Sequence, residues 1–146
     1  YHIPMDPNQK TNDDWKKVLP AEAFEVLREH ATEAPFSGEY LDHSEKGMYK
    51  CRACGTLLFT SEQKLNSSEW EPGLEGWPSF SNPAVAEHIG TRPDDSYGMF
   101  RTEIYCKNCG GHLGHVFDEK VQGAPRKHYC VNSVCLEFEK DSPDKP

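Results

Sequence analysis

Six cysteines carry most of the chemical information in this sequence of 146 residues. Four of them form two C-x-x-C pairs, each followed by glycine: Cys51-Arg52-Ala53-Cys54-Gly55 and Cys106-Lys107-Asn108-Cys109-Gly110. Two thiolates three positions apart, at a turn opened by glycine, can both face one ion about 2.3 Å away, as in a four-cysteine zinc site. Two disulfides or a redox C-x-x-C are alternatives, but a redox motif does not explain two matching pairs. We expect one structural zinc ion per chain, bound by Cys51, Cys54, Cys106 and Cys109.

The two remaining cysteines, Cys130 and Cys135, lie near the end of the chain. On a strand, side chains alternate with period two, so His128, Cys130 and Asn132 would project from one face. A thiol between a titratable group and an amide is suited to act as a nucleophile, and a buried structural cysteine is the alternative. By the same alternation Cys135 would point the other way, and we interpret it as a core residue.

Two histidines and a tryptophan complete the set of candidate functional residues. His112 and His115 directly follow the second cysteine pair and could bind metal. Four thiolates leave zinc no vacancy, however, so we interpret them as proton donors or a packing pair. Trp77 lies in the proline-stiffened segment Gly76-Trp77-Pro78-Ser79-Phe80, where its indole either contacts an apolar or methyl group of a ligand or packs in the core.

The elements that must position these residues are two short helices followed by strands. Thr11 to Asp14 resembles a helix N-cap with an acidic first turn, and Pro20 opens a second helix from Ala21 to Ala31. From Gly38 onward short alternating apolar runs predict strands near 47–51, 56–60, 84–89, 98–105, 114–118, 127–132 and 134–139. A connecting loop is predicted over 118–126. The pattern predicts two short helices packed on a zinc-clipped antiparallel β domain.

Composition limits the classes of function. The sequence has 16 Lys and Arg against 24 Asp and Glu, a net charge of −8, which disfavours nucleic-acid binding. With 36% hydrophobic and 27% charged residues, and apolar runs of three or four at most, no membrane-spanning helix is expected. We expect one catalytic domain over 1–139 and a solvated tail over 140–146. A zinc-ribbon binding module or a purely structural zinc domain would not explain Cys130 or the Trp77 segment, and a thioredoxin-like fold needs a βαβ pattern that is absent.

Taken together, four motifs resemble those of the type B methionine sulfoxide reductases: 76–80, the two C-x-x-C pairs, 112–117 and 129–133. The resemblance runs from about Asp14 to Phe138 and includes 35–38 and 95–99. It implies a mainly β fold of two antiparallel, β-tent-like sheets with short N-terminal helices. It also implies a peptide-methionine (R)-S-oxide reductase that repairs oxidised proteins and peptides by reducing the R epimer of methionine sulfoxide.

The resemblance assigns a role to each candidate residue. Cys130 matches the nucleophile that becomes a sulfenic acid, and His115, supported by His112, matches the acid that protonates the sulfoxide oxygen. Zinc lies away from the chemistry in this family and holds the fold together. The other implied site residues are Asn132, beside the nucleophile, and the substrate-binding side chains Trp77, Phe117 and His128.

Three departures from the family pattern concern residues around the site. Many members have arginine where this chain has His128, and a histidine there predicts a steeper pH dependence. Many also have a second histidine before the 95–99 segment, a place that His88 or Arg92 would fill. Members with an internal resolving cysteine often carry it just before Gly76, where this chain has Glu75.

Recycling of the sulfenic acid is expected to need an external thiol. Cys135 is the only thiol left over, but five residues of continuing strand span about 16 Å and end on the opposite face. A disulfide needs Cα atoms within about 7 Å. We therefore expect thioredoxin or another thiol reductant to attack Cys130 directly. We also expect a monomer that is cytoplasmic or, since Met does not precede Tyr1, a processed organellar chain.

Overall fold

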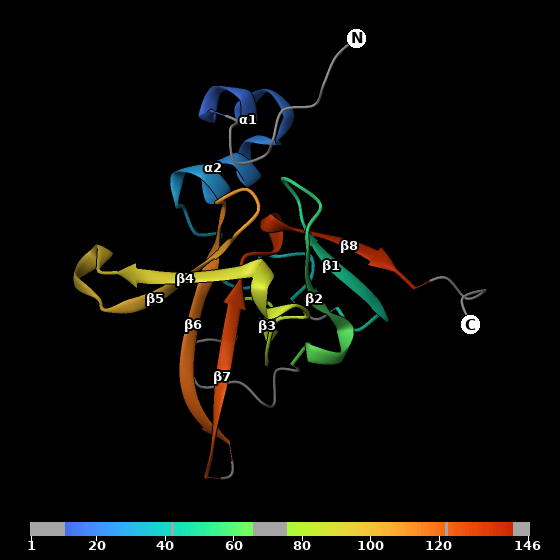
Figure 1. Ribbon diagram of the computed structural model, residues 1–146, viewed down its shortest axis with the longest axis vertical. Coiled ribbons are helices and arrows are strands. Elements are labelled where there is room, and N and C mark those ends of the chain that lie inside the picture. Colours follow the sequence, from blue (N-terminus) through green and yellow to red (C-terminus); the bar gives the residue numbers. More distant parts are fainter. Residues whose placement is uncertain (1–10, 42, 66–75, 122, 142–146) are drawn as a thin grey trace.

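Two helices lead into two antiparallel sheets in the computed structural model, which describes residues 11–41, 43–65, 76–121 and 123–141 (Figure 1). The helices are α1 (Asn12–Val18) and α2 (Ala21–Glu29). The strands are β1 (Gly47–Cys51), β2 (Leu57–Thr60), β3 (Ser79–Phe80), β4 (Ile89–Asp94), β5 (Arg101–Cys106), β6 (His112–Val121), β7 (Ala124–Val131) and β8 (Leu136–Lys140). The expected mainly β fold with short N-terminal helices is confirmed.

Helix α1 begins with a capping box, as its sequence predicts. The Thr11 side chain accepts a hydrogen bond from the Asp14 backbone at 3.2 Å, and the Asp14 carboxylate accepts one from the Thr11 backbone at 2.9 Å. Helix α2 follows Pro20 but ends at Glu29, two residues before the predicted Ala31, because His30 adopts a left-handed conformation (φ 60°). Within the described part of the chain, no helix is long and apolar enough to cross a membrane.

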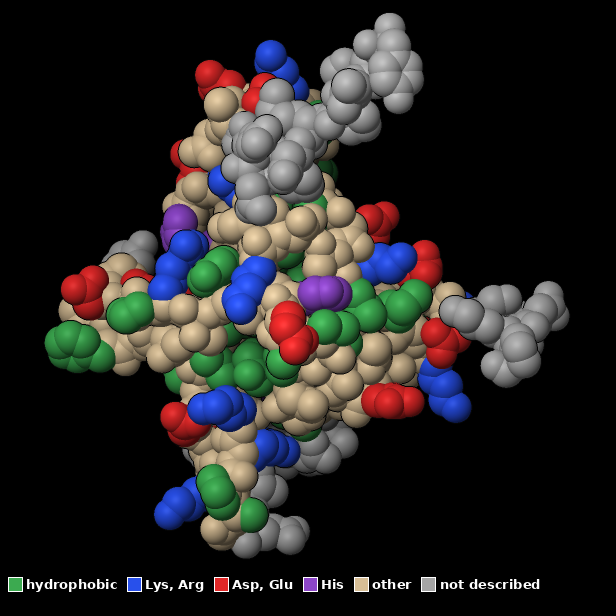
Figure 2. Space-filling model, viewed as in Figure 1, with side chains coloured by type: hydrophobic (Ala, Val, Ile, Leu, Met, Phe, Trp, Pro, Cys, Tyr) green, Lys and Arg blue, Asp and Glu red, His purple; other side chains and the backbone are tan. Residues whose placement is uncertain are grey.

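The two sheets enclose the core. One sheet has the strand order β2-β1-β8 and the other β3-β7-β6-β5-β4. Phe80 of β3 joins them, because its ring stacks on Phe59 of β2 at 4.2 Å between centroids and meets Tyr49 of β1 at 5.1 Å. Helix α2 covers the core with Ala23, Phe24, Val26 and Leu27. On the face shown in Figure 2, charged side chains of both signs surround a central band of hydrophobic ones.

Two predictions about the five-stranded sheet are wrong. The strand predicted over 84–89 is instead a 3-10 turn, Ala86–His88, and strand β4 only begins at Ile89. The loop predicted over 118–126 is largely a hairpin, because β6 continues to Val121 and β7 begins at Ala124. These hairpin strands are polar and project from the core, so they lack the apolar alternation that marks a half-buried strand.

The last predicted strand, 134–139, also begins later than expected. Residues Ser133–Cys135 form a 3-10 turn after Asn132, and β8 covers Leu136–Lys140. The assumption of one continuing strand from Cys130 to Cys135 is therefore wrong. The chain changes direction at Asn132 and passes from the five-stranded sheet to the three-stranded one.

Candidate active site and metal centre

A cavity of about 270 Å³ opens beside the C-terminal end of β7. Its walls come from separate parts of the chain: the segment before β3, the turn before β5, β5 itself, and the two central strands β6 and β7. Of the predicted site residues, it brings together Trp77, His115, Phe117, Cys130 and Asn132. Met99 and Arg101, from the β4–β5 hairpin, complete the lining of the cavity on that side.

Cys130 lies on β7 between two neighbouring strands, paired with His115 of β6 and with Ser79 of β3. Gly114 lets β6 approach this closely, because a Cβ at that position would collide with the Cys130 carbonyl oxygen. The thiol is 8% exposed, and burial, aided by the negative charge of Glu33, raises its pKa to about 12. Cys130 is therefore a protonated thiol in the free protein at neutral pH.

Asn132 and Trp77 are both fixed to the loop that follows α2. The Asn132 amide donates to the Leu113 carbonyl at 2.9 Å and accepts from the Glu33 backbone N–H at 2.9 Å. The Trp77 indole donates to the Glu33 carbonyl at 3.0 Å. The Glu33 carboxylate in turn accepts from the Val134 backbone at 3.1 Å, and burial raises its pKa. Glu33 was missed from the sequence, where no motif marks it.

Both histidines of the H-x-x-H motif contact carboxylates. His115 Nε2 lies 2.6 Å from Asp94 Oδ2, and His112 Nδ1 lies 2.9 Å from Glu103 Oε2. Burial lowers the pKa of each ring, and the neighbouring carboxylate opposes that effect. His112 does not line the cavity around Cys130. It lines an adjacent cavity that also includes His115.

His88 and Arg92, the two candidates to take the place of the second family histidine, differ in their contacts with the site. His88 lies 2.7 Å from the Leu57 carbonyl through Nδ1 and is not among the cavity residues. Arg92 binds the Glu103 carboxylate with two hydrogen bonds of 2.9 Å and so contacts the group that holds His112. Arg92 is therefore the candidate linked to the site.

His128, like His112, is a predicted site residue that the structure does not bring into the cavity around Cys130. It is fully buried, with Nε2 2.7 Å from Ser79 Oγ and Nδ1 3.0 Å from Glu119 Oε1. The period-two argument placed it on the Cys130 face, and the hydrogen bonds to Ser79 and Glu119 engage both nitrogens of its ring on that face. In place of the expected contact with substrate, the ring contacts side chains of β3 and β6, the two strands that flank β7.

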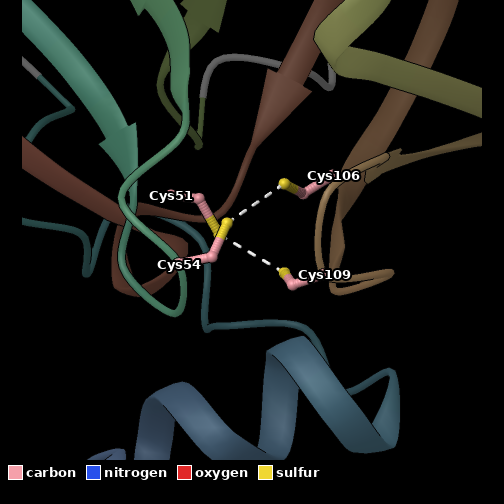
Figure 3. Close-up of side chains that lie close together, drawn as sticks. All are labelled: Cys51, Cys54, Cys106 and Cys109. Carbon is pink, nitrogen blue, oxygen red and sulfur yellow. Dashed lines mark hydrogen bonds between the residues drawn. The ribbon is translucent and has the colours of Figure 1, made fainter. Parts of the chain in front are cut away.

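The four paired cysteines converge from two distant turns (Figure 3). Sγ of Cys51 lies 3.7 Å from Sγ of Cys109, and Sγ of Cys54 lies 3.6 Å from Sγ of Cys106. All four sulfurs lie within 4.8 Å of one another, and none of the six cysteines is in a disulfide. In a tetrahedral site with Zn–S bonds of about 2.3 Å, sulfurs lie about 3.8 Å apart. The cluster has the size of such a site.

Glycine shapes both cysteine turns, as the shared motif predicts. Gly55 and Gly110 have φ of 81° and 76°, which favour a residue without Cβ. Each glycine N–H donates to the carbonyl of the first cysteine of its pair, at 2.8 Å for Cys51 and 2.7 Å for Cys106. Hydrogen bonds among the four thiols lower the pKa of Cys54, with Cys106 the largest contributor, and raise the pKa of Cys51 and Cys109. These four cysteines could hold a metal ion.

Comparisons with known proteins agree with this geometry. A family model described as SelR domain matches residues 19–140. "Peptide methionine sulfoxide reductase MsrB" of Methanosarcina barkeri is 44% identical over 138 residues, 94% of this chain and 92% of that protein. The protein of that name from Bradyrhizobium diazoefficiens is 45% identical over 130 residues, covering 89% and 88%. "Probable methionine-R-sulfoxide reductase B" of Caenorhabditis elegans is 43% identical over 139 residues, covering 94% and 88%. The chain therefore belongs to the SelR-domain family of type B methionine sulfoxide reductases.

Proposed function

We propose that this protein reduces the R epimer of methionine sulfoxide in oxidised proteins and peptides, with Cys130 as the nucleophile. The observation that carries the proposal is the shared cavity, which places a thiol, an imidazole and an indole around one space. The names of the relatives support the substrate, since one of them is called a methionine-R-sulfoxide reductase. Repair of this lesion is the chemistry that such a site would serve.

The reaction requires a proton on the sulfoxide oxygen. The Cys130 sulfur attacks the sulfoxide sulfur, whose oxygen is protonated to a hydroxyl group. The S–O bond to the substrate breaks as this hydroxyl group passes to the Cys130 sulfur, so methionine leaves and Cys130 becomes a sulfenic acid. Sulfoxide oxygen is a poor leaving group until it is protonated, and His115, paired with Cys130 across the sheet, is placed to donate the proton. Because the free thiol is itself protonated, its proton is released during attack, and the His115 ring, which has given a proton to the sulfoxide oxygen, accepts it.

The aromatic walls support the proposed selection of one epimer. The three groups on the sulfoxide sulfur are the methyl group, the side-chain methylene and the oxygen. If Trp77 holds the methyl group and the oxygen faces His115, then only one epimer presents its sulfur to Cys130. Phe117 and Met99 extend the apolar wall, which suits a soft thioether group.

Recycling is proposed to use an external thiol such as thioredoxin. The strand argument against Cys135 no longer applies, but burial supplies another. Cys135 is 0% exposed, its Sγ donates to the His112 carbonyl at 3.3 Å, and burial raises its pKa far above the usual range. The external thiolate attacks the Cys130 sulfenic acid, releasing water and forming a mixed disulfide, and a second thiol then frees Cys130.

A structural zinc ion is proposed at the four-cysteine cluster. Cys51, Cys54, Cys106 and Cys109 supply four thiolates at separations that suit tetrahedral coordination. None of the four lines the cavity around Cys130, so a metal there would hold the two cysteine turns together and take no part in reduction.

The test is dithiothreitol-dependent reduction of a dabsyl-labelled methionine R-sulfoxide, with the S epimer measured in parallel. We expect turnover of the R epimer alone, and loss of turnover in Cys130→Ser with the fold retained, because a hydroxyl is not a competent nucleophile here. Cys135→Ser serves as the matched control and should keep most of the activity. Turnover by Cys130→Ser, or equal rates on both epimers, would contradict the proposal.

A further inference from the structure

We propose that the β4–β5 hairpin supplies two further positioning residues for this reaction, Asp94 and Glu103, which fix the orientation and protonation of His115 and His112. The inference rests on the proposed function, because it assigns groups that act through the proton donor. Neither carboxylate lies among the residues around Cys130. Both act indirectly, because each is hydrogen-bonded to a histidine ring.

Two ion pairs join the strands of the hairpin at successive positions on one face. The cation belongs to β4 in one pair and to β5 in the other. In the β4–β5 register Arg92 faces Glu103, and Asp94 faces Arg101. Arg92 Nε and one terminal nitrogen each lie 2.9 Å from the Glu103 carboxylate, and Arg101 lies 3.5 Å from Asp94. Residues two apart on a strand share a face, so both carboxylates are presented on the same side of the hairpin.

Each carboxylate also binds one histidine of the adjacent strand β6. Asp94 lies 2.6 Å from His115 Nε2, and Glu103 lies 2.9 Å from His112 Nδ1. The two rings contact each other edge to face, with centroids 5.5 Å apart. The hairpin therefore holds both histidines by a repeated unit of cation, carboxylate and imidazole.

The hydrogen bond that His115 donates to Asp94 determines which nitrogen of the ring exchanges protons with a substrate. A neutral imidazole carries one proton, and a carboxylate acceptor keeps it on the nitrogen that faces it. With Nε2 bonded to Asp94, Nδ1 is the atom left to give a proton to a bound sulfoxide. The carboxylate also stabilises the imidazolium form, which is the form that can donate.

The Glu103 carboxylate is 5% exposed and needs compensation for its charge. Burial pushes its pKa upward, but hydrogen bonds from Arg92 and His112 outweigh burial and the pKa falls below its usual value. His30, at the end of α2, adds a third contact at 3.3 Å. Glu103 thus stays ionised and holds the His112 ring beside His115.

The charges that face His115 come from every neighbouring element. Asp94 of β4 and Glu103 of β5 raise its pKa, whereas Arg101 of β5 and burial lower it. His112 lies beside it on β6, and Cys130 lies opposite on β7. Removing the Asp94 charge leaves Arg101 without its partner, so the His115 pKa should fall.

The experiment compares Asp94→Asn and Glu103→Gln with wild type in two measurements. The first is kcat and KM on an R-sulfoxide peptide. The second is a ¹⁵N-histidine NMR titration, which reports the tautomer and pKa of His115 without turnover. Asp118→Asn is the matched control, because this carboxylate of β6 is 86% exposed and pairs only with Lys127 in the ion pairs found among the described residues. If Glu103→Gln does not fold, Arg92→Gln takes its place in both measurements, because Arg92 is more exposed and binds the same carboxylate.

We expect Asp94→Asn to lower kcat about tenfold, a part of the roughly 10²- to 10⁴-fold that general acid catalysis contributes, with little change in KM. The His115 pKa should fall in the same variant, and Asp118→Asn should behave as wild type. A kcat within about twofold of wild type, or an unchanged His115 pKa, overturns the assignment of Asp94. The same kcat result in Glu103→Gln, or in Arg92→Gln where Glu103→Gln does not fold, overturns that of Glu103. Failure of wild type to reduce the peptide would instead refute the proposed function, because the titration does not depend on turnover.

Discussion

Loss of the proposed metal centre should be the most damaging change to stability. The double variant Cys106→Ser, Cys109→Ser removes half of the proposed ligands and opens the link between two turns that are 52 positions apart, from Cys54 to Cys106. In the chain-entropy model, closing a loop of about 50 residues contributes about 4 kcal/mol at 25 °C. For a chain of this length each kcal/mol shifts Tm by about 2–4 °C, so we expect Tm to fall by roughly 8–16 °C.

The assay is thermal unfolding by circular dichroism together with metal analysis of the purified protein. Wild type should contain one equivalent of zinc and the double variant well under one, with the drop in Tm following the loss of metal. Cys130→Ser is the control, because it removes a thiol outside the cluster and should keep both the zinc and a Tm close to wild type. Wild type that is metal-free, soluble and active, or a double variant with unchanged Tm, would refute the reasoning.

Three further predictions concern the chemistry of the site. Because the Cys130 pKa is raised to about 12, its alkylation by iodoacetamide should accelerate about tenfold per pH unit from pH 7 to 10; a plateau near pH 8 would show an activated thiolate. His115→Ala should lower kcat on an R-sulfoxide peptide about 10²-fold, and an unchanged kcat would exclude it as the acid. After one turnover without reductant, mass spectrometry should find a sulfenic acid on Cys130; a Cys130–Cys135 disulfide as the main product would show that Cys135 resolves it.

Strand β4 shows why part of the fold could not be predicted. Gly90 and Pro93 resemble chain breaks, but each has a structural reason within the strand. A Cβ at Gly90 would collide with the Tyr105 ring of β5, and that ring also contacts Arg92 at 4.3 Å. Proline lacks an N–H and is tolerated on an edge strand, and β4 is the edge of its sheet. The local sequence shows where glycine and proline occur, but the reason that a strand tolerates them lies in its neighbour and in its place in the sheet.

The same limit separates the site residues that could be predicted from those that were missed. Cys130, His115 and Trp77 lie in compact motifs whose spacing suggests chemistry, and the structure places all three around one cavity. Asp94 and Glu103 belong to strands with ordinary alternating charge, and nothing in their local sequence distinguishes them from solvated residues. Their contacts depend on the register of β4, β5 and β6, and the register shift between Ile104 and Tyr105 in the β5–β6 pairing cannot be read from the sequence.

Position 128 shows how a departure from a family motif can be compensated elsewhere. The family resemblance implied arginine there, and a histidine alone predicted a steeper pH dependence. In the structure, Arg126 lies two residues earlier on the same face of β7 and binds Glu119 at 2.6 and 3.0 Å. Glu119 is almost fully buried, so it requires a positive partner, and the guanidinium supplies a charge that does not titrate near neutrality. His128 can then bind the same carboxylate oxygen and Ser79 without a charge of its own. A comparison of residue types at position 128 alone misses this pair, because the cation comes from Arg126 and the carboxylate from Glu119.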